Sequence, residues 1–315
     1  MDFKALLSQW IENESDVYSI LPGSTLLHAA VSAGDLESVQ LLLSKGHPWN
    51  VVDENSKSAG ELAQECGYPD IYDYLVAEGT RVELLLSALG IRTHDESPDE
   101  PTNAVYLASK LTYEEGKLLD DESNGVMMGW EAPLMKYHAE LICPEPGKRI
   151  LNIGFGLGII DTEIQKRQPS VHTIIEAHPD VYMKMIDDGW DKKPGVQIIF
   201  GRWQDVMDQL THAYDGIFFD TFGEYYDDLH EFHEHLPNIL EQDGIYSYFN
   251  GLCGTNSFFH DVSCNVCECH LSEMGIETTY QELEMDTLGD DVWKGIKRAY
   301  FSLNTYRLPK CKFIV

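Results

Sequence analysis

The sequence predicts an α/β fold with a mostly parallel sheet, preceded by a small all-α repeat region. Two observations support this prediction. From residue 149 onward, short apolar runs typical of strands alternate with helical patterns, which indicates a parallel sheet with helices on both faces. Before residue 93, helical patterns recur instead with a period of 33 residues.

Composition and charge limit the classes of function. The chain has 315 residues, 43% of them hydrophobic, which is enough for one large or two modest globular domains. No apolar run approaches the ~18 residues that a membrane-spanning helix needs, so we expect no membrane association. Against 53 Asp and Glu stand 22 Lys and Arg, a net charge of −31. This charge disfavours nucleic acid and favours a basic partner, although it also serves solubility alone.

Cysteine usage and the start of the chain bear on location. The chain has seven cysteines, an odd number, and its first residues are acidic and lack the apolar core of a signal peptide. We therefore expect reduced thiols and a protein of the cytoplasm, the nucleus or both.

The N-terminal part reads as a short amphipathic helix over 1–20 followed by repeats. The opening TLLHAA at 25–30 and the recurrence of Gly34 at Gly67, 33 residues later, are the signature of ankyrin repeats. In such repeats a histidine hydrogen-bonds the turn, so we interpret His28 as structural rather than as a ligand or base.

The repeats define the predicted domain organisation. An ankyrin-like domain covers 1–92 and ends in a capping helix at 80–92. The acidic, proline-containing segment 93–103 is the linker, and the second domain covers 104–315. Two repeats bury little surface alone, so we expect them to lean on the second domain.

The second domain is expected to begin with a helix over 104–120, and an irregular segment from 125 that runs into a helix through 142. The later elements follow from the alternating pattern. We expect strands at 149–154, 172–176, 196–200, 214–220, 244–249, 276–284 and 298–307, and helices at 157–167, 179–188, 203–210, 227–241 and 259–274. A turn at Asp243-Gly244 is expected to precede the fifth strand.

A glycine turn after the first parallel strand marks a cofactor site. Glycines let the backbone approach a ligand closely, and the following helix offers free N–H groups. The dinucleotide pattern GxGxxG would need glycine at position 159, which is Ile. The GxGxG spacing is instead typical of the S-adenosylmethionine-binding variant of the Rossmann fold, and its residues are Gly154, Phe155, Gly156, Leu157 and Gly158.

Three further strand ends carry side chains that suit this cofactor. Glu176 ends the second parallel strand, where a carboxylate accepts hydrogen bonds from a ribose diol. Arg202 and Trp203 follow the third strand, where an adenine is flanked. Asp220 ends the fourth strand and is expected to face the reactive end of the cofactor.

Glu131, beside Trp130, and Asp220, beside Thr221, are the candidates for the acceptor site. A guanidinium is a poor nucleophile because its charge and lone pairs are delocalised. Two carboxylates can localise the charge on one nitrogen, orient the planar group and accept a proton. An acidic, desolvated pocket therefore suits a guanidino substrate, whereas Glu131 alone could also be a carboxylate that stabilises a helix start.

Five segments, GVMMGWEAPLM, LNIGFGLGII, TIIEAHPDV, GRWQDV and FDTF, resemble guanidinoacetate N-methyltransferase in this order. They resemble still more the fungal type IV protein arginine methyltransferases, which methylate the internal δ-nitrogen of arginine. That family also carries ankyrin-like repeats ahead of the catalytic domain, and the C-terminal segments YFNGLCGTNSFFHDV, VWKGIKRAY and YRLPKCKF are similar too.

The resemblance implies a class I, Rossmann-like methyltransferase domain with S-adenosylmethionine as cofactor. It implies that Glu131 and Asp220 grip the substrate guanidinium, with Asp220 as proton acceptor. It also implies a set of cofactor contacts: Tyr106, Met127, Met135, Gly154, Phe155, Gly156, Leu157, Gly158, Glu176, Arg202, Trp203 and Asp220.

Three hypotheses follow. The first is an S-adenosylmethionine-dependent arginine N-methyltransferase that modifies the δ-nitrogen in a basic protein, with ribosomal proteins as candidates, recruited by the repeats and steered by charge. The second is methylation of a small guanidino compound, which needs no docking repeats. The third is a non-catalytic ankyrin scaffold with a vestigial methyltransferase domain, against which Glu131, Glu176 and Asp220 argue. The oligomeric state and the target arginine stay open.

Two groups of residues that could bind metal remain. The first has zinc-like spacing but falls on different faces of one expected helix, so we expect thiols rather than a metal site; it comprises Cys264, Cys267, Cys269 and His270. The second lies in DDLHEFHEH, which reads as a solvated acidic helix; it comprises His230, His233 and His235.

Overall fold

The computed structural model describes residues 20–21, 24–91, 103–286, 288–289 and 291–314. These fall into two compact units. One holds the described residues up to Ile91 together with Asn256–Val266, and the other holds the remainder. The expected helix at 1–20 and the linker at 93–103 lie almost wholly outside the described residues. Within these residues no helix is long and apolar enough to cross a membrane.

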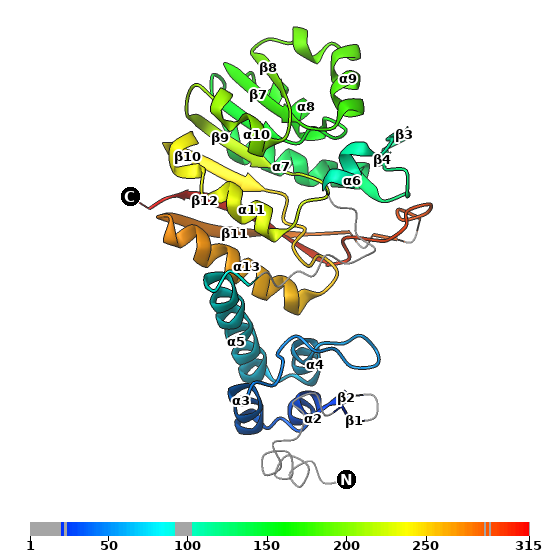
Figure 1. Cartoon of the computed structure of the whole chain (residues 1–315), viewed down its shortest axis with the longest axis vertical. Helices are drawn as coiled ribbons and strands as arrows, with labels where there is room; N and C mark the ends of the chain where they lie inside the picture. Colours follow the sequence, from blue (N-terminus) through cyan, green and yellow to red (C-terminus); the bar gives the residue numbers. More distant parts are fainter. Residues whose placement is uncertain (1–19, 22–23, 92–102, 287, 290, 315) are drawn as a thin grey trace. The chain divides into compact units, whose positions relative to one another are not determined.

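The first unit is built from helix pairs (Figure 1). Its elements are β1 (Ile20–Leu21), β2 (Ser24–Thr25), α2 (Leu26–Ser32), α3 (Leu36–Ser44), α4 (Ala59–Cys66) and α5 (Pro69–Ala88). His28 is structural as predicted, because its ring nitrogens lie 2.8 Å from Thr25 Oγ1 and 3.0 Å from the Lys57 carbonyl.

The capping helix expected at 80–92 is not a separate element. Its residues continue α5, and Gly79 lies inside this helix rather than in a turn. A Cβ at Gly79 would lie 2.8 Å from the ring of Trp49 and 3.1 Å from Val262. Glycine is therefore required here by close packing and not by a change of chain direction.

Helix α13 (Ser257–Glu273) begins in the first unit and completes its core. The Phe258 side chain is fully buried and lies 5.8 Å, ring to ring, from both Trp49 and Tyr72. The Tyr72 hydroxyl donates to Asp261 at 2.6 Å. The repeats thus bury their surface against a segment that is distant in sequence.

The second unit contains a seven-stranded sheet in the order β11-β12-β10-β9-β6-β7-β8. Strands β8, β7, β6, β9 and β10 are parallel, and β12 is antiparallel to both of its neighbours. This confirms the predicted α/β, Rossmann-like class. The bounds are β6 (Arg149–Ile153), β7 (Val171–Glu176), β8 (Val196–Phe200), β9 (Tyr214–Phe219), β10 (Leu240–Tyr248), β11 (Ile276–Glu284) and β12 (Thr305–Phe313).

Helices cover both faces of this sheet (Figure 1). Neighbouring residues of β6 enter different cores, Ile150 with Phe218 and Leu151 with Tyr246, as alternation along a strand requires. The helices are α7 (Ala132–Ile142), α8 (Ile159–Lys166), α9 (Pro179–Asp187), α10 (Trp203–Val206), α11 (Tyr226–His233), α12 (Leu236–Ile239) and α13.

The single helix expected over 104–120 is wrong. The chain forms α6 (Asn103–Ala108) and then β3 (Thr112–Glu114) and β4 (Lys117–Leu119), which pair with β5 (Gly125–Met128). Gly116, with φ of +70°, makes the turn between β3 and β4. After β5 a short 3₁₀ turn, Gly129–Glu131, leads into α7.

Four later features also differ from expectation. The helix expected at 227–241 is two helices, because Pro237 starts α12 after the chain has turned. The strand expected at 298–307 is β12 at Thr305–Phe313, since Phe301 is buried in a side-chain core instead. The helix expected at 203–210 is α10, which ends at Val206, and a 3₁₀ turn follows it. Asp243 and Gly244 form an irregularity inside β10 rather than a turn before it.

Candidate active site

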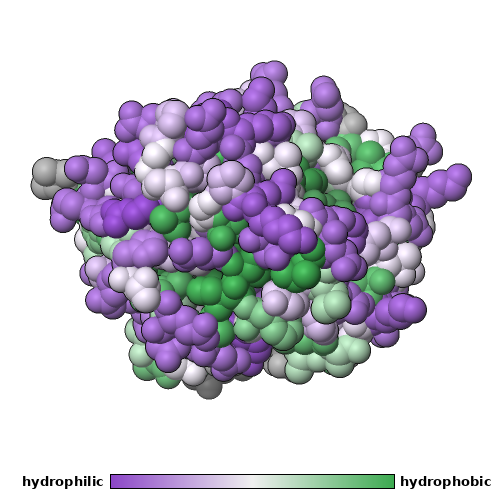
Figure 2. Space-filling model, turned by 90° about the horizontal axis from the view of Figure 1, so that it is seen from above, coloured by the Kyte–Doolittle hydropathy of each residue, from purple (hydrophilic) through white to green (hydrophobic). Residues whose placement is uncertain are grey.

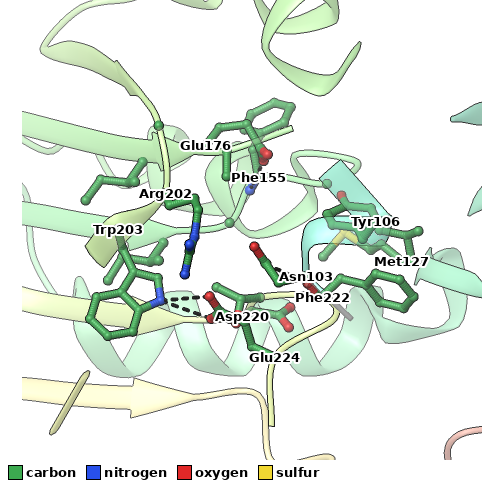
Figure 3. A pocket seen from close by; sticks show the side chains of 18 residues that line it. Asn103, Tyr106, Met127, Phe155, Glu176, Arg202, Trp203, Asp220, Phe222 and Glu224 are labelled. Atoms are coloured by element: carbon green, nitrogen blue, oxygen red, sulfur yellow. Dashed lines mark hydrogen bonds between the residues drawn. The ribbon is translucent and has the colours of Figure 1, made fainter. Parts of the chain in front are cut away.

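A cleft lies at the carboxyl edge of the parallel strands, and the empty space in and at the mouth of this cleft is about 590 Å³. This is where strand order reverses between β6 and β9, the usual ligand position in such sheets. Its lining residues come from four strand ends and from α6 and β5 (Figure 3): Asn103, Tyr106, Val126, Met127, Ile153, Gly154, Phe155, Gly156, Ile175, Glu176, Ala177, Gly201, Arg202, Trp203, Asp220, Thr221, Phe222 and Glu224.

The glycine turn fits closely against its surroundings. Gly154 has φ of +91°, and a Cβ on it would lie 1.8 Å from the Asp220 carbonyl oxygen. Gly156 has φ of +55°, and its Cβ would lie 2.8 Å from Met127 Sδ. Both glycines are therefore needed for conformation and for space, and they leave backbone rather than side chains facing the cleft.

Three residues expected to contact the cofactor do not line the cleft. Met135 is fully buried because its face of α7 points into the core with Ala139. Leu157 donates its N–H to Met127 Sδ at 3.2 Å, and Gly158 caps α8 beneath the ring of Phe155.

Glu176 has the geometry of a diol-binding carboxylate. It is buried, and its two oxygens accept hydrogen bonds from the backbone N–H groups of Phe155 at 2.9 Å and His178 at 2.6 Å. Burial raises the pKa of Glu176, while these backbone donors oppose the rise. A carboxylate oriented in this way at the end of the second parallel strand fits a ribose of an adenosine-type cofactor.

The opposite wall contains residues that sequence reasoning missed. Glu224 accepts from Trp203 Nε1 at 3.0 Å (Figure 3). It also accepts from Gln204 Nε2 at 2.9 Å and from Thr221 Oγ1 at 2.6 Å. Burial raises the pKa of Glu224. The sequence shows an acid four residues after Asp220, but nothing in it indicates that this loop folds back onto Trp203.

Phe222 and Asn103 were missed as well. The Phe222 ring packs edge-to-face against Tyr106 with ring centroids 4.9 Å apart, and the Asn103 side chain donates to the Phe222 carbonyl at 3.4 Å. Figure 3 shows Tyr106, Met127 and Phe222 grouped on one side of the cleft and Trp203 on the other. The sequence signal was weak because α6 and the loop after β9 are 119 residues apart.

Glu131 and Asp220 are brought together although 89 positions separate them. Asp220 lines the cleft at the end of β9, and Glu131 is 3% exposed at the start of α7. Burial raises the pKa of Glu131 to about 7. Burial, followed by repulsion from Glu131, raises the pKa of Asp220 well above its usual value. The buried Glu131 and the half-buried Asp220, two carboxylates that repel each other, form a site for a hydrogen-bonding cation.

This arrangement predicts a pH-dependent stability of the ligand-free protein. Because the folded-state pKa of Glu131 is raised, its ionisation destabilises the fold as the pH rises through about 7. We expect Glu131→Gln to stabilise the protein relative to wild type at pH 8 more than at pH 5. Urea unfolding at both pH values measures this. A difference between the two proteins that does not change with pH would contradict it.

The two groups of residues that could bind metal, in α11 and in α13, make other contacts in the structure. His233 is fully buried and hydrogen-bonds Tyr246 at 3.0 Å, so α11 is not the solvated helix expected. His230 stacks on His270 with ring centroids 3.8 Å apart. Cys267 is buried beside the Tyr248 hydroxyl, and Cys264 lies 3.6 Å from His260 Nε2. Among the described residues no group of three or more His, Cys, Asp or Glu is arranged to hold a metal.

Comparisons with known proteins agree with the geometry. Residues 99–304 match the family model of guanidinoacetate N-methyltransferase, and residues 3–112 match that of ankyrin repeats in three copies. Protein arginine N-methyltransferase 2 of Aspergillus oryzae is 36% identical over 88% of this chain and 78% of its own length. That of Cryptococcus neoformans is 38% identical over 92% of this chain and 86% of its own length.

Among solved structures, TYW2 of M. jannaschii in complex with AdoMet is similar at a TM-score of 0.42 and 14% identity. The similarity covers 65% of this chain and 87% of that chain.

Proposed function

This chain belongs to the protein arginine N-methyltransferase 2 family, and we propose that it methylates the δ-nitrogen of an arginine in a basic protein. That it is an S-adenosylmethionine-dependent methyltransferase acting on arginine follows from its family. Two points go beyond the family and are proposed: which nitrogen is methylated, and that the substrate is a basic protein. The observation that carries the proposal is the pair formed by the buried Glu131 and the half-buried Asp220 at the cofactor cleft.

The cleft residues suit the cofactor in chemistry and shape. When bound, S-adenosylmethionine supplies an electrophilic methyl group on a sulfonium sulfur. Glu176 would hold the ribose, the turn at Gly154 and Gly156 would admit the cofactor close to the backbone, and Trp203 would flank the adenine. Asp220 lines the same cleft and would face the methyl-transfer end.

Glu131 and Asp220 would then act on the acceptor. Their oxygens accept hydrogen bonds from the planar guanidinium, orient it and draw its charge toward the bound N–H groups. The reacting nitrogen releases its proton to Asp220, and its lone pair forms the new N–C bond as the electrons of the old S–C bond remain on sulfur. Charge is conserved, because the sulfonium loses its positive charge as the Asp220 carboxylate, on accepting the proton, loses its negative charge.

The pair also bears on which nitrogen reacts. A guanidinium has two terminal nitrogens and one internal nitrogen. If one oxygen of Asp220 accepts from the internal N–H while its other oxygen and Glu131 hold the terminal nitrogens, the internal δ-nitrogen is the one that faces the methyl group. Holding only one terminal nitrogen would expose the other and yield an ω-methylated product. Two converging carboxylates therefore favour the δ position.

Charge supports a basic protein as substrate. The net charge is −31, and Glu37, Glu54 and Asp70 are exposed on the ankyrin helices and loops. Figure 2 shows a mostly hydrophilic face crossed by a central strip of hydrophobic residues. Electrostatic steering would speed the encounter with a basic chain. Ribosomal proteins are the first candidates, which would locate the enzyme in the cytoplasm, the nucleus or both.

The test is methyl transfer from labelled S-adenosylmethionine to a cognate proteome and, in parallel, to free guanidinoacetate. We expect mass-spectrometric fragmentation to identify δ-N-methylarginine in a basic protein. The Glu131→Gln, Asp220→Asn double variant is the matched control for endogenous activity. Product that is only ω-methylated would overturn the choice of nitrogen. Product found only on the small molecule would overturn the protein substrate.

A further inference from the structure

Tyr300 approaches the acceptor site from the segment between β11 and β12. We infer that Tyr300 is a positioning residue, which holds one oxygen of the Glu131 carboxylate so that the other oxygen is presented to the substrate guanidinium. The inference rests on the proposed function in one respect, namely that Glu131 binds the acceptor. Tyr300 ends the segment VWKGIKRAY, but the sequence assigned it no role, and it is 169 positions away from Glu131.

The hydrogen bonds to Glu131 are asymmetric. The Tyr300 hydroxyl donates to Oε1, and the Met128 backbone N–H donates to the same oxygen at 2.8 Å. In the part of the chain that the structure describes, no hydrogen bond is made to Oε2. A carboxylate oxygen with two donors has little capacity left, so Oε2 is the atom available to a substrate N–H.

The Tyr300 ring is itself held in place. Its centroid lies 5.7 Å from that of Trp130 and 5.1 Å from that of Trp293. A Cβ on Gly125 would lie 3.3 Å from the Tyr300 ring, so the ring rests directly on the backbone of β5. Trp130 immediately precedes Glu131 in the chain. The same aromatic group therefore fixes the donor beside its acceptor.

Backbone hydrogen bonds anchor the segment on both sides of Tyr300. The Lys297 N–H donates to the Ser123 carbonyl at 2.8 Å, and the Ser302 N–H donates to the Gly254 carbonyl at 2.8 Å. The Lys117 ammonium also donates to the Lys294 carbonyl at 2.8 Å. These bonds hold the segment against β4 and the turn before β5, so the hydroxyl reaches Glu131 without an ordering step at substrate binding.

The hydroxyl keeps its proton under working conditions. Burial and the charges of Glu131 and Asp220 raise the pKa of Tyr300 well above its usual value. Its donation lowers the pKa of Glu131 and so opposes the effect of burial. The titratable groups that face Glu131 are Asp220 and Tyr300. Tyr300 thus both orients the carboxylate and favours its ionised form.

The test is Tyr300→Phe, which keeps the ring and removes only the hydroxyl. We expect kcat at pH 7 to fall about tenfold, since a hydrogen bond to a charged group is lost. The acid limb of the kcat profile should move up by about one pH unit, because Glu131 ionises less readily. The affinity for S-adenosylmethionine should not change, because Tyr300 does not line the cofactor cleft.

Tyr214→Phe is the matched control. Tyr214 lies at the start of β9, the strand that ends before Asp220, and its buried hydroxyl donates to Thr173 Oγ1 at 3.0 Å. This variant also loses a buried hydrogen bond but not one to Glu131. We expect it to lower stability and to leave the pH profile unchanged. A Tyr300→Phe variant with the wild-type pH profile would overturn the inference, whatever its stability.

A direct titration separates this inference from the proposed function. Carbon-13 NMR of carboxyl-labelled, substrate-free enzyme reports the ionisation of Glu131, with Glu131→Gln identifying its signal. Tyr300→Phe should raise the midpoint of this signal, and Tyr214→Phe should not. If Tyr300→Phe leaves the midpoint of the Glu131 titration unchanged, the role inferred for Tyr300 is refuted. A product methylated at a nitrogen other than the δ-nitrogen would refute only the proposed choice of nitrogen and would leave the role of Tyr300 untouched.

Discussion

Asp220→Asn and Glu131→Gln are each expected to abolish methyl transfer while S-adenosylmethionine still binds. An amide at position 220 cannot take the proton that the reacting nitrogen releases, and general-base catalysis contributes about 10²–10⁴-fold to a rate. An amide at position 131 also replaces an acceptor oxygen by a donor that repels the guanidinium. Single-turnover transfer of labelled methyl measures the loss, and calorimetry with S-adenosylmethionine measures the retained binding.

Asp188→Asn serves as the control for removing a carboxylate. Asp188 is on the surface after α9, where it pairs with Lys184 at 2.7 Å, and exposed pairs contribute little. Its activity should equal that of wild type. Because Glu131 and Asp220 are proposed to hold one group together, the double variant should be scarcely slower than either single variant. Full activity in both single variants would refute the roles assigned to the pair.

Gly154→Ala is expected to lower the free energy of unfolding by at least about 4 kcal/mol or to prevent accumulation of folded protein. The new Cβ would lie 1.8 Å from the Asp220 carbonyl oxygen. No side chain can move to relieve this contact, because the obstacle is the backbone that follows β9. Strands β6 and β9 would have to separate, and Asp220 would leave its position beside Glu131.

Gly147→Ala isolates the part of this loss that is due to conformation. Gly147 has φ of +87°, close to the +91° of Gly154, but its Cβ would meet nothing within 4 Å. Only the strain of a left-handed alanine remains, about 1 kcal/mol. Urea unfolding followed by tryptophan fluorescence compares the variants. Equal losses would show that the backbone contact at Gly154 is unimportant.

The features that sequence predicted well are local. The strand, glycine turn and helix around Gly154, and the turn-bonding His28, each depend on residues within a few positions. Where local patterns competed, the prediction was wrong. Residues 104–120 have a helical pattern as far as Ala108, but Gly116 and pairing with β5 turn the rest into strands. Gly79 lies inside α5, and its packing partner Trp49 is far away in sequence, so no local pattern indicates why glycine is needed there.

The sequence by itself determined the fold class, the repeats and the glycine turn after the first parallel strand, because short-range backbone preferences and hydrophobic periodicity encode them. It also pointed to Glu131 and Asp220 as the candidate acceptor carboxylates, whose roles remain proposals. Only the tertiary structure decided that Glu224 closes onto Trp203, that Met135 is core, that Phe258 completes the ankyrin unit and that Tyr300 holds Glu131. These contacts join residues that no spacing rule relates. They arise because the sheet order and the packing of whole segments determine which distant side chains share a buried space.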